Sequence, residues 1–329
     1  MRRTLIFFLI VGTVLAAEGY QVLNTIKIGG PGFWDYLAMD NANHRLYVSN
    51  STRVVVVDPD AGKVVGEIPD TPGVHGIAIA DKLNKGYVSD GRTNCVTVFD
   101  LKTLKVLGKV EMTGMNPDAI IYEPKSARVY TFNGRSNDAT AIDAKTDKIV
   151  TTIPVGGKPE FAAVDGAGHI FFNVENTSEI AEIEAEQAII SHRESLKPCE
   201  DPSGLAIDAQ KGVLFSVCRN KMMAVTDAKT LKVMATPEIG QGPDAAAFDP
   251  ATGTAFSSNG RDGTLTLVKQ VNGKWQAVDS VKTEMFARTM ALDPQTHRAD
   301  PGGPAPAGGD PQGRPSMEPD SFHLVVVGK

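Results

Sequence analysis

The chain repeats itself about every 42 residues, and this repeat constrains its fold more than any other feature. One motif ends on Asn or Asp and occurs as RLYVSN (45–50), KGYVSD (85–90), RVYTFN (128–133) and TAFSSN (254–259). A second motif follows it as VVVVDPDAGKVVGEI (54–68), VTVFDLKTLKVLGKV (96–110) and ATAIDAKTDKIVTTI (139–153). Each unit therefore contains several short strands separated by turns.

A short segment opens each unit, and its second residue falls at positions 35, 75, 118, 160, 203, 244 and 288. Repeats of about 40–45 residues with four strands are typical of a β-propeller. One blade cannot bury both of its faces, so the blades must stack radially around a channel. A two-sheet sandwich is the alternative, but it would not keep this spacing seven times. We predict an all-β fold, a seven-bladed β-propeller with four-stranded blades.

The two ends of the chain predict how the ring closes. The segment QVLNTIKIGG (21–30) is similar to KIVTTIPVGG (148–157), which is the outermost strand of the third unit. The last unit ends in SFHLVVVGK (321–329), which is similar to a third strand, and it has no fourth strand of its own. We expect the N-terminal strand to complete the last blade, which leaves no exposed sheet edge at the seam.

One segment departs from the repeat. The second strand of blade 7 should begin near Arg298, but a Pro/Gly-rich stretch occupies 299–320. Proline and glycine disfavour a regular ladder of hydrogen bonds. We interpret 299–320 as a flexible loop and expect blade 7 to lack one strand.

The first residues, MRRTLIFFLIVGTVLAAEGY, combine two arginines, an apolar run and small residues at Ala16 and Ala17. This pattern is typical of a secretory signal peptide. An uncleaved membrane anchor is the alternative, although the run is short for one. We expect a signal peptide at 1–17, a single propeller domain at 18–329, a periplasmic or secreted location and no membrane span after cleavage.

Composition and motifs exclude several classes of function. The net charge is −6 and no lysine or arginine run exists, so a nucleic-acid surface is not indicated. The chain contains no GxSxG, phosphate-binding loop, dinucleotide fingerprint or CxxCH haem motif.

The segments RLYVSN, GYVSD, VTVFDLKTLKV, IPVGGKPEFAAV and FSSNGRDGTLTLV resemble the YVTN-repeat (YncE-like) β-propeller family. The resemblance covers about 21–329. It implies a secreted or periplasmic seven-bladed propeller, in a family mostly without assigned function. The wider fold neighbourhood includes lactonases and metal-dependent hydrolases. The chain departs from the family pattern in the second strand of blade 7 and at EIAEIEAEQAII in blade 4.

Internal repeats separate structural residues from candidate site residues. Aspartates recur at two strand ends, where Asp side chains accept backbone N–H groups of the following turn. They are Asp40, Asp165, Asp208, Asp249 and Asp293 after the first strand, and Asp58, Asp100, Asp143 and Asp227 after the third. We interpret them as structural.

The opening position instead varies from blade to blade, as Asp35, His75, Asp118, Glu160, Ser203, Asp244 and Arg288. Because the first strand is innermost, these residues form a ring at one mouth of the channel. The end of the second strand lies beside them. The candidate ligand-binding residues are Asp35, Asp118, Asn133, Lys158, Asn173, Glu175, Asn220, Lys221, Asp244 and Asn259. The alternative is that these polar residues only hydrate the channel.

Three ring residues are candidates for catalysis. His75 or Glu160 could activate water, and Arg288, or Lys158 beside the ring, could stabilise an oxyanion. Glu160 and Glu175 are candidate ligands of a divalent cation, which is the only cofactor that the sequence suggests. The other histidines, at 44, 169, 192, 297 and 323, are predicted to lie on the surface.

The chain has three cysteines, and antiparallel pairing in blade 5 brings Cys199 close to Cys218. We predict a disulfide between them and a buried free thiol at Cys95.

The sequence thus predicts an exported, monomeric propeller that binds a small ligand, a metal or a protein partner at the channel mouth. The alternatives are a lactonase- or esterase-like hydrolase and a non-catalytic protein-interaction scaffold.

Overall fold

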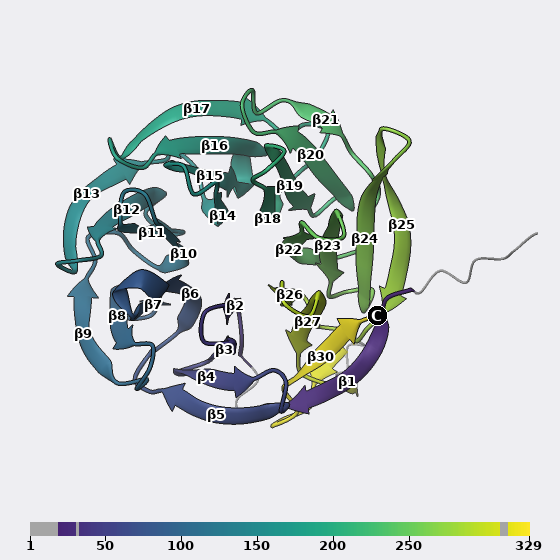
Figure 1. Cartoon of the computed structure of the whole chain (residues 1–329), viewed down its shortest axis with the longest axis horizontal. Helices are drawn as coiled ribbons and strands as arrows, with labels where there is room; N and C mark the ends of the chain where they lie inside the picture. The colour runs from purple at the N-terminus through teal and green to yellow at the C-terminus, as the bar shows by residue number, and fades with distance from the viewer. Residues whose placement is uncertain (1–18, 31–32, 310–314) are drawn as a thin grey trace, which may run out of the picture.

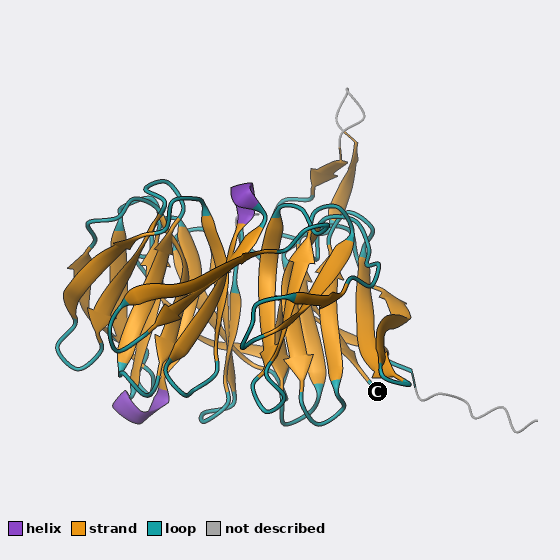
Figure 2. Ribbon diagram, turned by 90° about the horizontal axis from the view of Figure 1, so that it is seen from above, coloured by secondary structure: helices purple, strands orange, loops and turns teal. Residues whose placement is uncertain are grey.

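A computed structural model describes residues 19–30, 33–309 and 315–329. Seven four-stranded antiparallel sheets surround a central axis (Figure 1). The prediction of an all-β, seven-bladed propeller is confirmed. Two single-turn 3₁₀ helices, η1 (Asp81–Leu83) and η2 (Glu175–Thr177), connect successive strands on opposite faces of the propeller (Figure 2).

The blades follow the repeats, and in blades 1 to 6 the strands run in order from the channel outwards. Blade 1 contains β2 (Leu37–Asp40), β3 (Arg45–Asn50), β4 (Arg53–Asp58) and β5 (Lys63–Ile68); blade 2 contains β6 (Val74–Ala80), β7 (Lys85–Asp90), β8 (Cys95–Asp100) and β9 (Val106–Glu111). Blade 3 contains β10 (Pro117–Glu123), β11 (Arg128–Asn133), β12 (Asp138–Asp143) and β13 (Lys148–Pro154); blade 4 contains β14 (Pro159–Val164), β15 (His169–Val174), β16 (Glu179–Glu184) and β17 (Ile189–Ser195). Blade 5 contains β18 (Pro202–Asp208), β19 (Val213–Cys218), β20 (Met222–Asp227) and β21 (Val233–Ala235); blade 6 contains β22 (Pro243–Asp249), β23 (Thr254–Asn259), β24 (Thr264–Val271) and β25 (Lys274–Lys282).

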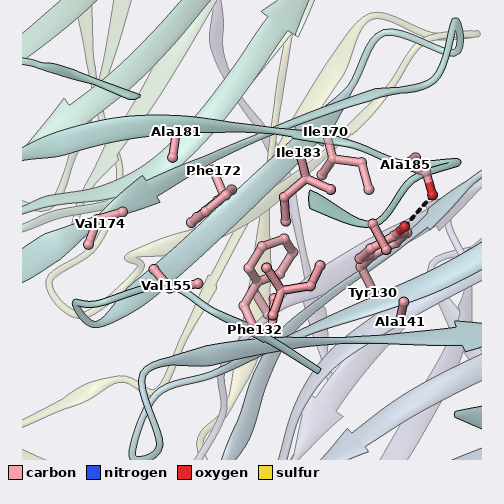
Figure 3. Packing of buried hydrophobic residues seen from close by; sticks show 14 residues of the cluster. Tyr130, Phe132, Ala141, Val155, Ile170, Phe172, Val174, Ala181, Ile183 and Ala185 are labelled. Carbon is pink, nitrogen blue, oxygen red and sulfur yellow. Dashed lines mark hydrogen bonds between the residues drawn. The ribbon is translucent and has the colours of Figure 1, made fainter. Parts of the chain in front are cut away.

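The hydrophobic core lies between blades. Aromatic and β-branched residues of the second and third strands are buried because each blade packs on two neighbours. Between blades 3 and 4, Phe132 and Phe172 pack with ring centroids 5.0 Å apart, and the Tyr130 hydroxyl donates to the Ala185 carbonyl of the next blade (Figure 3). The Tyr87 hydroxyl makes the equivalent bond to Ala144. The repeated tyrosine therefore joins neighbouring blades.

The repeated aspartates hold the turns, as predicted. The Oδ1 atom of Asp58 accepts the N–H groups of Asp60 and Ala61, and Asp143 accepts those of Lys145 and Thr146. These residues have structural roles common to the blades.

The ring closes between the two ends of the chain, as predicted. Strand β1 (Gln21–Lys27) pairs antiparallel with β30 (His323–Gly328), and Ile26 lies opposite Leu324. The chain thus completes blade 7 from both ends. The predicted signal peptide at 1–17 lies outside the described residues.

The expectation that blade 7 lacks one strand is wrong. Residues Arg298–Gly303, RADPGG, form β27, which pairs with β26 (Thr289–Asp293) and with β30. Residues 299, 302 and 303 of β27 pair with β30. Pro301, which has no N–H to donate, does not pair with it. A Cβ at Gly303 would lie 2.7 Å from the Phe286 carbonyl, so the close approach of these two segments requires glycine.

The rest of the predicted loop also contains strands. Strands β28 (Pro306–Gly309) and β29 (Pro315–Met317) pair and project from the face that carries η2 (Figure 2). Within the described residues, no helix is long and apolar enough to cross a membrane.

Candidate ligand-binding mouth of the channel

Serines of the second strands hold the ring positions in place. The Ser49 Oγ accepts the Asp35 N–H at 2.7 Å. In the next blade, the Ser89 Oγ accepts the Gly76 N–H at 2.8 Å and donates to the Asp118 carbonyl at 2.5 Å. The Ser49 bond lies within blade 1, whereas the Ser89 bonds connect the innermost strands of blades 2 and 3, so the YVS segments of these two blades fix the backbone from which the ring side chains project.

Blades 1 to 3 bring Asp35, His75 and Asp118 together. The His75 Nδ1 lies 2.6 Å from an Asp35 oxygen and 3.6 Å from an Asp118 oxygen. Burial opposes the charged imidazolium, but the Asp35 hydrogen bond and the nearby carboxylates outweigh it and raise the pKa of His75 to about 9. His75 therefore carries a proton at neutral pH and acts as a cation rather than as a base.

Blade 4 places an ammonium between its two carboxylates. The Lys158 Nζ lies 2.6 Å from Glu160 and also contacts Glu175. The structure thus brings together the two residues predicted as metal ligands, but a lysine occupies the space between them. Burial and the Asp118 charge raise the pKa of Glu160 above its usual range, although Lys158 opposes the shift.

Blades 6 and 7 contribute an ion pair between Arg288 and Asp244. The Arg288 guanidinium also lies 5.2 Å from the centre of the Trp34 ring, a cation–π distance. Burial raises the pKa of Asp244 to about 6, while the Arg288 charge lowers it. Arg288 is thus held in place and partly neutralised.

The ring and its neighbours carry an excess of negative charge. The cations His75, Lys158 and Arg288 face five carboxylates, namely Asp35, Asp118, Glu160, Glu175 and Asp244. Burial and the Asp35 charge raise the pKa of Asp118 to about 7. A ligand cation, or a proton shared among the carboxylates, would relieve this repulsion.

An aromatic pair that the repeat pattern did not single out lies next to the ring. Tyr36 of blade 1 and Phe161 of blade 4 stack with ring centroids 4.1 Å apart. The Tyr36 hydroxyl is buried, has no hydrogen-bond partner among the described residues, and lies in the field of the ring carboxylates. Burial and these carboxylates raise its pKa well above the usual value of 10.

The repeats contain a signal that would have found this pair. The residue after the ring position is small in five blades, as Gly76, Ala119, Gly204, Ala245 and Thr289. It is aromatic only at Tyr36 and Phe161, which lie in nearly opposite blades. At Gly76 and Gly204 a Cβ would lie 2.8 Å from Ile120 and 2.5 Å from the Asp244 carbonyl oxygen, so small residues here allow neighbouring innermost strands to pack closely.

A hollow of about 960 Å³ adjoins the ring on the side of blades 5 to 7. Its charged and polar lining comprises Glu175, Asp201, Ser203, Arg219, Asn220, Lys221, Gln241, Asp244, Arg261 and Arg288, and Met285 and Phe286 add apolar surface. Four predicted ligand-binding residues, Glu175, Asn220, Lys221 and Asp244, thus share one hollow with the predicted catalytic residue Arg288.

Two of the cations in the hollow are uncompensated. Arg219 pairs with Asp201 at 2.9 Å, Arg288 pairs with Asp244, and Glu175 contacts Lys158. Within the described part of the chain, no ion pair involves Lys221 or Arg261. Arg261 was not among the residues predicted from the sequence, which in blade 6 were only Asp244 and Asn259.

Three predicted ligand-binding amides lie inside the blades instead. Asn133, Asn173 and Asn259 are fully buried. Asn133 donates to Asp138 and Thr140, Asn259 donates to Thr264 and Thr266, and Asn173 donates to the Ser203 and Gly204 carbonyls. Their side chains stabilise blades and cannot reach a ligand in the mouth in this conformation.

Several other predictions concern single residues. Cys199 and Cys218 form a disulfide with their Cα atoms 5.7 Å apart, and Cys95 is a buried free thiol, both as predicted. The surface assignment is wrong for His323, which has a 13% exposed side chain and contacts Glu284. His44 is partly exposed and lies 3.0 Å from both Asp60 and Asp293, so it links blades 1 and 7.

Comparison with known proteins supports the fold alone. No protein-family model matches the chain, and no curated protein matches its sequence. Among solved structures, that of U3-55K is similar with a TM-score of 0.76 and 8% identity, over 95% of this chain and 99% of that one. Hydrazine synthase from Kuenenia stuttgartiensis is similar with a TM-score of 0.70 and 15% identity, over 88% of this chain and 95% of that one. At these identities the likeness shows a shared propeller architecture.

Proposed function

We propose that this protein is a binding propeller that holds a small organic anion in the hollow beside its channel mouth. The hollow has the size of a typical small-molecule site, which is about 300–1,000 Å³. The observation that carries the proposal is the pair of uncompensated cations, Lys221 and Arg261, in the lining of that hollow. Because the whole chain has a net charge of −6, a locally positive hollow is not a consequence of composition.

The remaining lining suits such a ligand. Ser203, Asn220 and Gln241 add groups that donate or accept hydrogen bonds, and Met285 and Phe286 offer apolar contact. A carboxylate or phosphate group would form charge-assisted hydrogen bonds with Lys221 and Arg261. The carboxylate-rich ring next to the hollow would attract a positively charged or hydroxyl-bearing part of the same ligand.

The hydrolase alternative depends on the ring. Because His75 is protonated between Asp35 and Asp118, it is a poor general base. Asp118, with a pKa raised to about 7, is the ring residue best suited to donate a proton near neutral pH. Assays on a panel of lactones and esters test this second function, with Asp118→Asn as the variant that should abolish any turnover.

Membership of the YVTN-repeat family, export by a signal peptide and a monomeric state belong to the same proposal. They rest on the repeated motifs and on the apolar N-terminal run. Mass spectrometry of the protein recovered from the periplasm or medium would show whether residues 1–17 are removed.

The repeats supply a matched test of anion binding. Arg261 and Arg135 occupy the same turn in blades 6 and 3, because each N–H bonds the equivalent carbonyl, of Gln241 and of Met115. Only Arg261 lines the hollow. Calorimetric titration with citrate, gluconate and glucose 6-phosphate should show binding of at least one anion that weakens with added salt.

We expect Arg261→Ala and Lys221→Ala each to weaken that binding by about tenfold or more, since a hydrogen bond to a charged group contributes about 1.5–3 kcal/mol. Arg135→Ala should leave it unchanged. The proposal fails if none of the three anions binds at millimolar concentration, or if Arg135→Ala weakens binding as much as Arg261→Ala.

A further inference from the structure

Blade 4 carries a carboxylate where the other blades carry a buried apolar residue. At the fourth position of the third strand, blades 1, 2, 3, 5 and 6 have Val56, Val98, Ala141, Val225 and Leu267, all of them buried. The equivalent residue of β16 is Glu182, which is half-buried. A carboxylate in such a position is costly unless a cation compensates it.

Glu182 lies among side chains of the types that bind metal ions. His169, Glu182 and Glu184 offer ligand atoms that all lie within 4.8 Å of one another. The strand register places His169 opposite Glu184 and Glu182 opposite His192. These four residues of three adjacent strands therefore share one face of the sheet.

A further carboxylate orients the His169 ring. The His169 Nδ1 lies 2.6 Å from the Asp165 Oδ2, while the Asp165 Oδ1 accepts the Ala167 and His169 N–H groups. This arrangement engages Nδ1 and leaves Nε2 available. Histidines that bind metals usually donate their other ring N–H to a carboxylate in this way. A hollow of about 110 Å³ adjoins the group, and its charged lining comprises His169, Glu184, Glu186 and Lys125, whose Nζ donates to the Ala167 carbonyl.

We propose that blade 4 binds one divalent transition-metal ion of the zinc class through His169, Glu182 and Glu184. His192 lies opposite Glu182 on the next strand but outside this group of three. Imidazole and carboxylate donors suit zinc, nickel or copper, whereas magnesium and calcium prefer oxygen ligands alone. The site lies at the start of β15, and the channel mouth lies at its far end, beside Glu175. The proposal is therefore independent of anion binding at the mouth.

The other blades show which substitution at Glu182 should remove the zinc ligand without disturbing the fold. Glu182→Val introduces the residue that blades 1, 2 and 5 have at this position, so the variant should fold. We expect equilibrium dialysis against Zn²⁺, followed by elemental analysis, to show one bound ion in the wild type. Glu182→Val and His169→Gln should each weaken zinc binding by about 100-fold or more. Zinc should raise the thermal midpoint of the wild type but not that of Glu182→Val.

Two control variants distinguish zinc bound in blade 4 from zinc bound at the channel mouth. The mouth holds a second group of residues that could bind a metal, namely Asp35, His75 and Asp118. Because we place the zinc in blade 4, His75→Gln should retain it. Asp165→Asn keeps an oxygen for the turn but loses the carboxylate, and should weaken zinc binding by about 10–100-fold. The proposal is overturned if Glu182→Val binds zinc as tightly as the wild type, or if His75→Gln is the variant that loses the ion.

Discussion

Asp90 shows how the repeats identify a residue that does not suit its position. It is fully buried at the end of β7, where its Oδ2 accepts a hydrogen bond from Thr97 at 2.6 Å. Its other oxygen has no partner among the described residues, and burial raises the pKa of the carboxyl group to about 7. Asn133 and Asn259 occupy the same position and donate their amides to the equivalent threonines.

Replacing Asp90 with asparagine should therefore stabilise the protein. Because the folded pKa lies above the unfolded value of 3.8, the carboxyl group contributes stability below about pH 4 and loses it as the pH rises to about 7. We expect the stability of Asp90→Asn, relative to the wild type, to increase across this range. At pH 8 the variant should be more stable by about 1 kcal/mol or more. Urea unfolding at pH 4, 5, 6 and 8 measures the difference, and a difference independent of pH would contradict the argument.

At the scale of residues, the sequence predicts where a side chain lies in the ring better than it predicts which side chains it contacts. The repeat placed Asp35, His75 and Asp118 in one ring, because strand geometry is the same in every blade. It did not predict that Lys158 lies between Glu160 and Glu175, since rotamers of long side chains depend on their neighbours. It also misassigned Asn133 and Asn259, because alternation along a twisted strand does not show which strand ends are buried.

At the scale of elements, β27 shows where local composition misleads. The segment RADPGG has low strand propensity, yet it pairs on both sides because β26 and β30 leave a gap of one strand between them. Its glycines allow the close contacts that side chains would prevent. Tertiary context therefore overrides propensity here. The other strands were predictable because each repeats an alternating pattern and ends on a turn residue.

Blade 5 has the weakest outer pairing. Its outermost strand β21 has three residues, whereas β25 of blade 6 has nine. The disulfide joins Cys199, just before the innermost strand, to Cys218 at the end of β19. It thus fixes the side of blade 5 that lines the hollow beside the channel mouth.

Removing this disulfide should destabilise the protein measurably. A crosslink over a sequence separation of 19 residues stabilises by about 3 kcal/mol in the chain-entropy estimate. We expect the double variant Cys199→Ser/Cys218→Ser to lose stability of this order in guanidinium unfolding, and a reducing agent to weaken the wild type but not the variant. Cys95→Ser, which changes the free thiol, is the control for sensitivity to the reducing agent. Equal stability of double variant and wild type would contradict a structural role.

At the scale of the whole molecule, closure decides whether seven blades form one cooperative unit. Blade 7 is built from β26, β27 and β30 at one end of the chain and from β1 at the other. Without β1, the hydrogen-bonding edge of β30 would be open to solvent and to other chains. The strand is held by one deeply buried side chain, Ile26, which is 3% exposed and packs with the core between blades 7 and 1.

A single charge should therefore open the ring. Ile26→Asp places a carboxylate in an apolar environment without a partner, which we expect to cost about 3 kcal/mol or more and to release β1 from β30. Val22 lies in the same strand but is 42% exposed, so Val22→Asp should change stability by less than about 0.5 kcal/mol. Denaturant unfolding measures both, and size-exclusion chromatography should show association of Ile26→Asp through the exposed edge. If the two variants are equally stable and equally monomeric, β1 does not hold the ring closed, and the other blade interfaces alone must maintain the propeller.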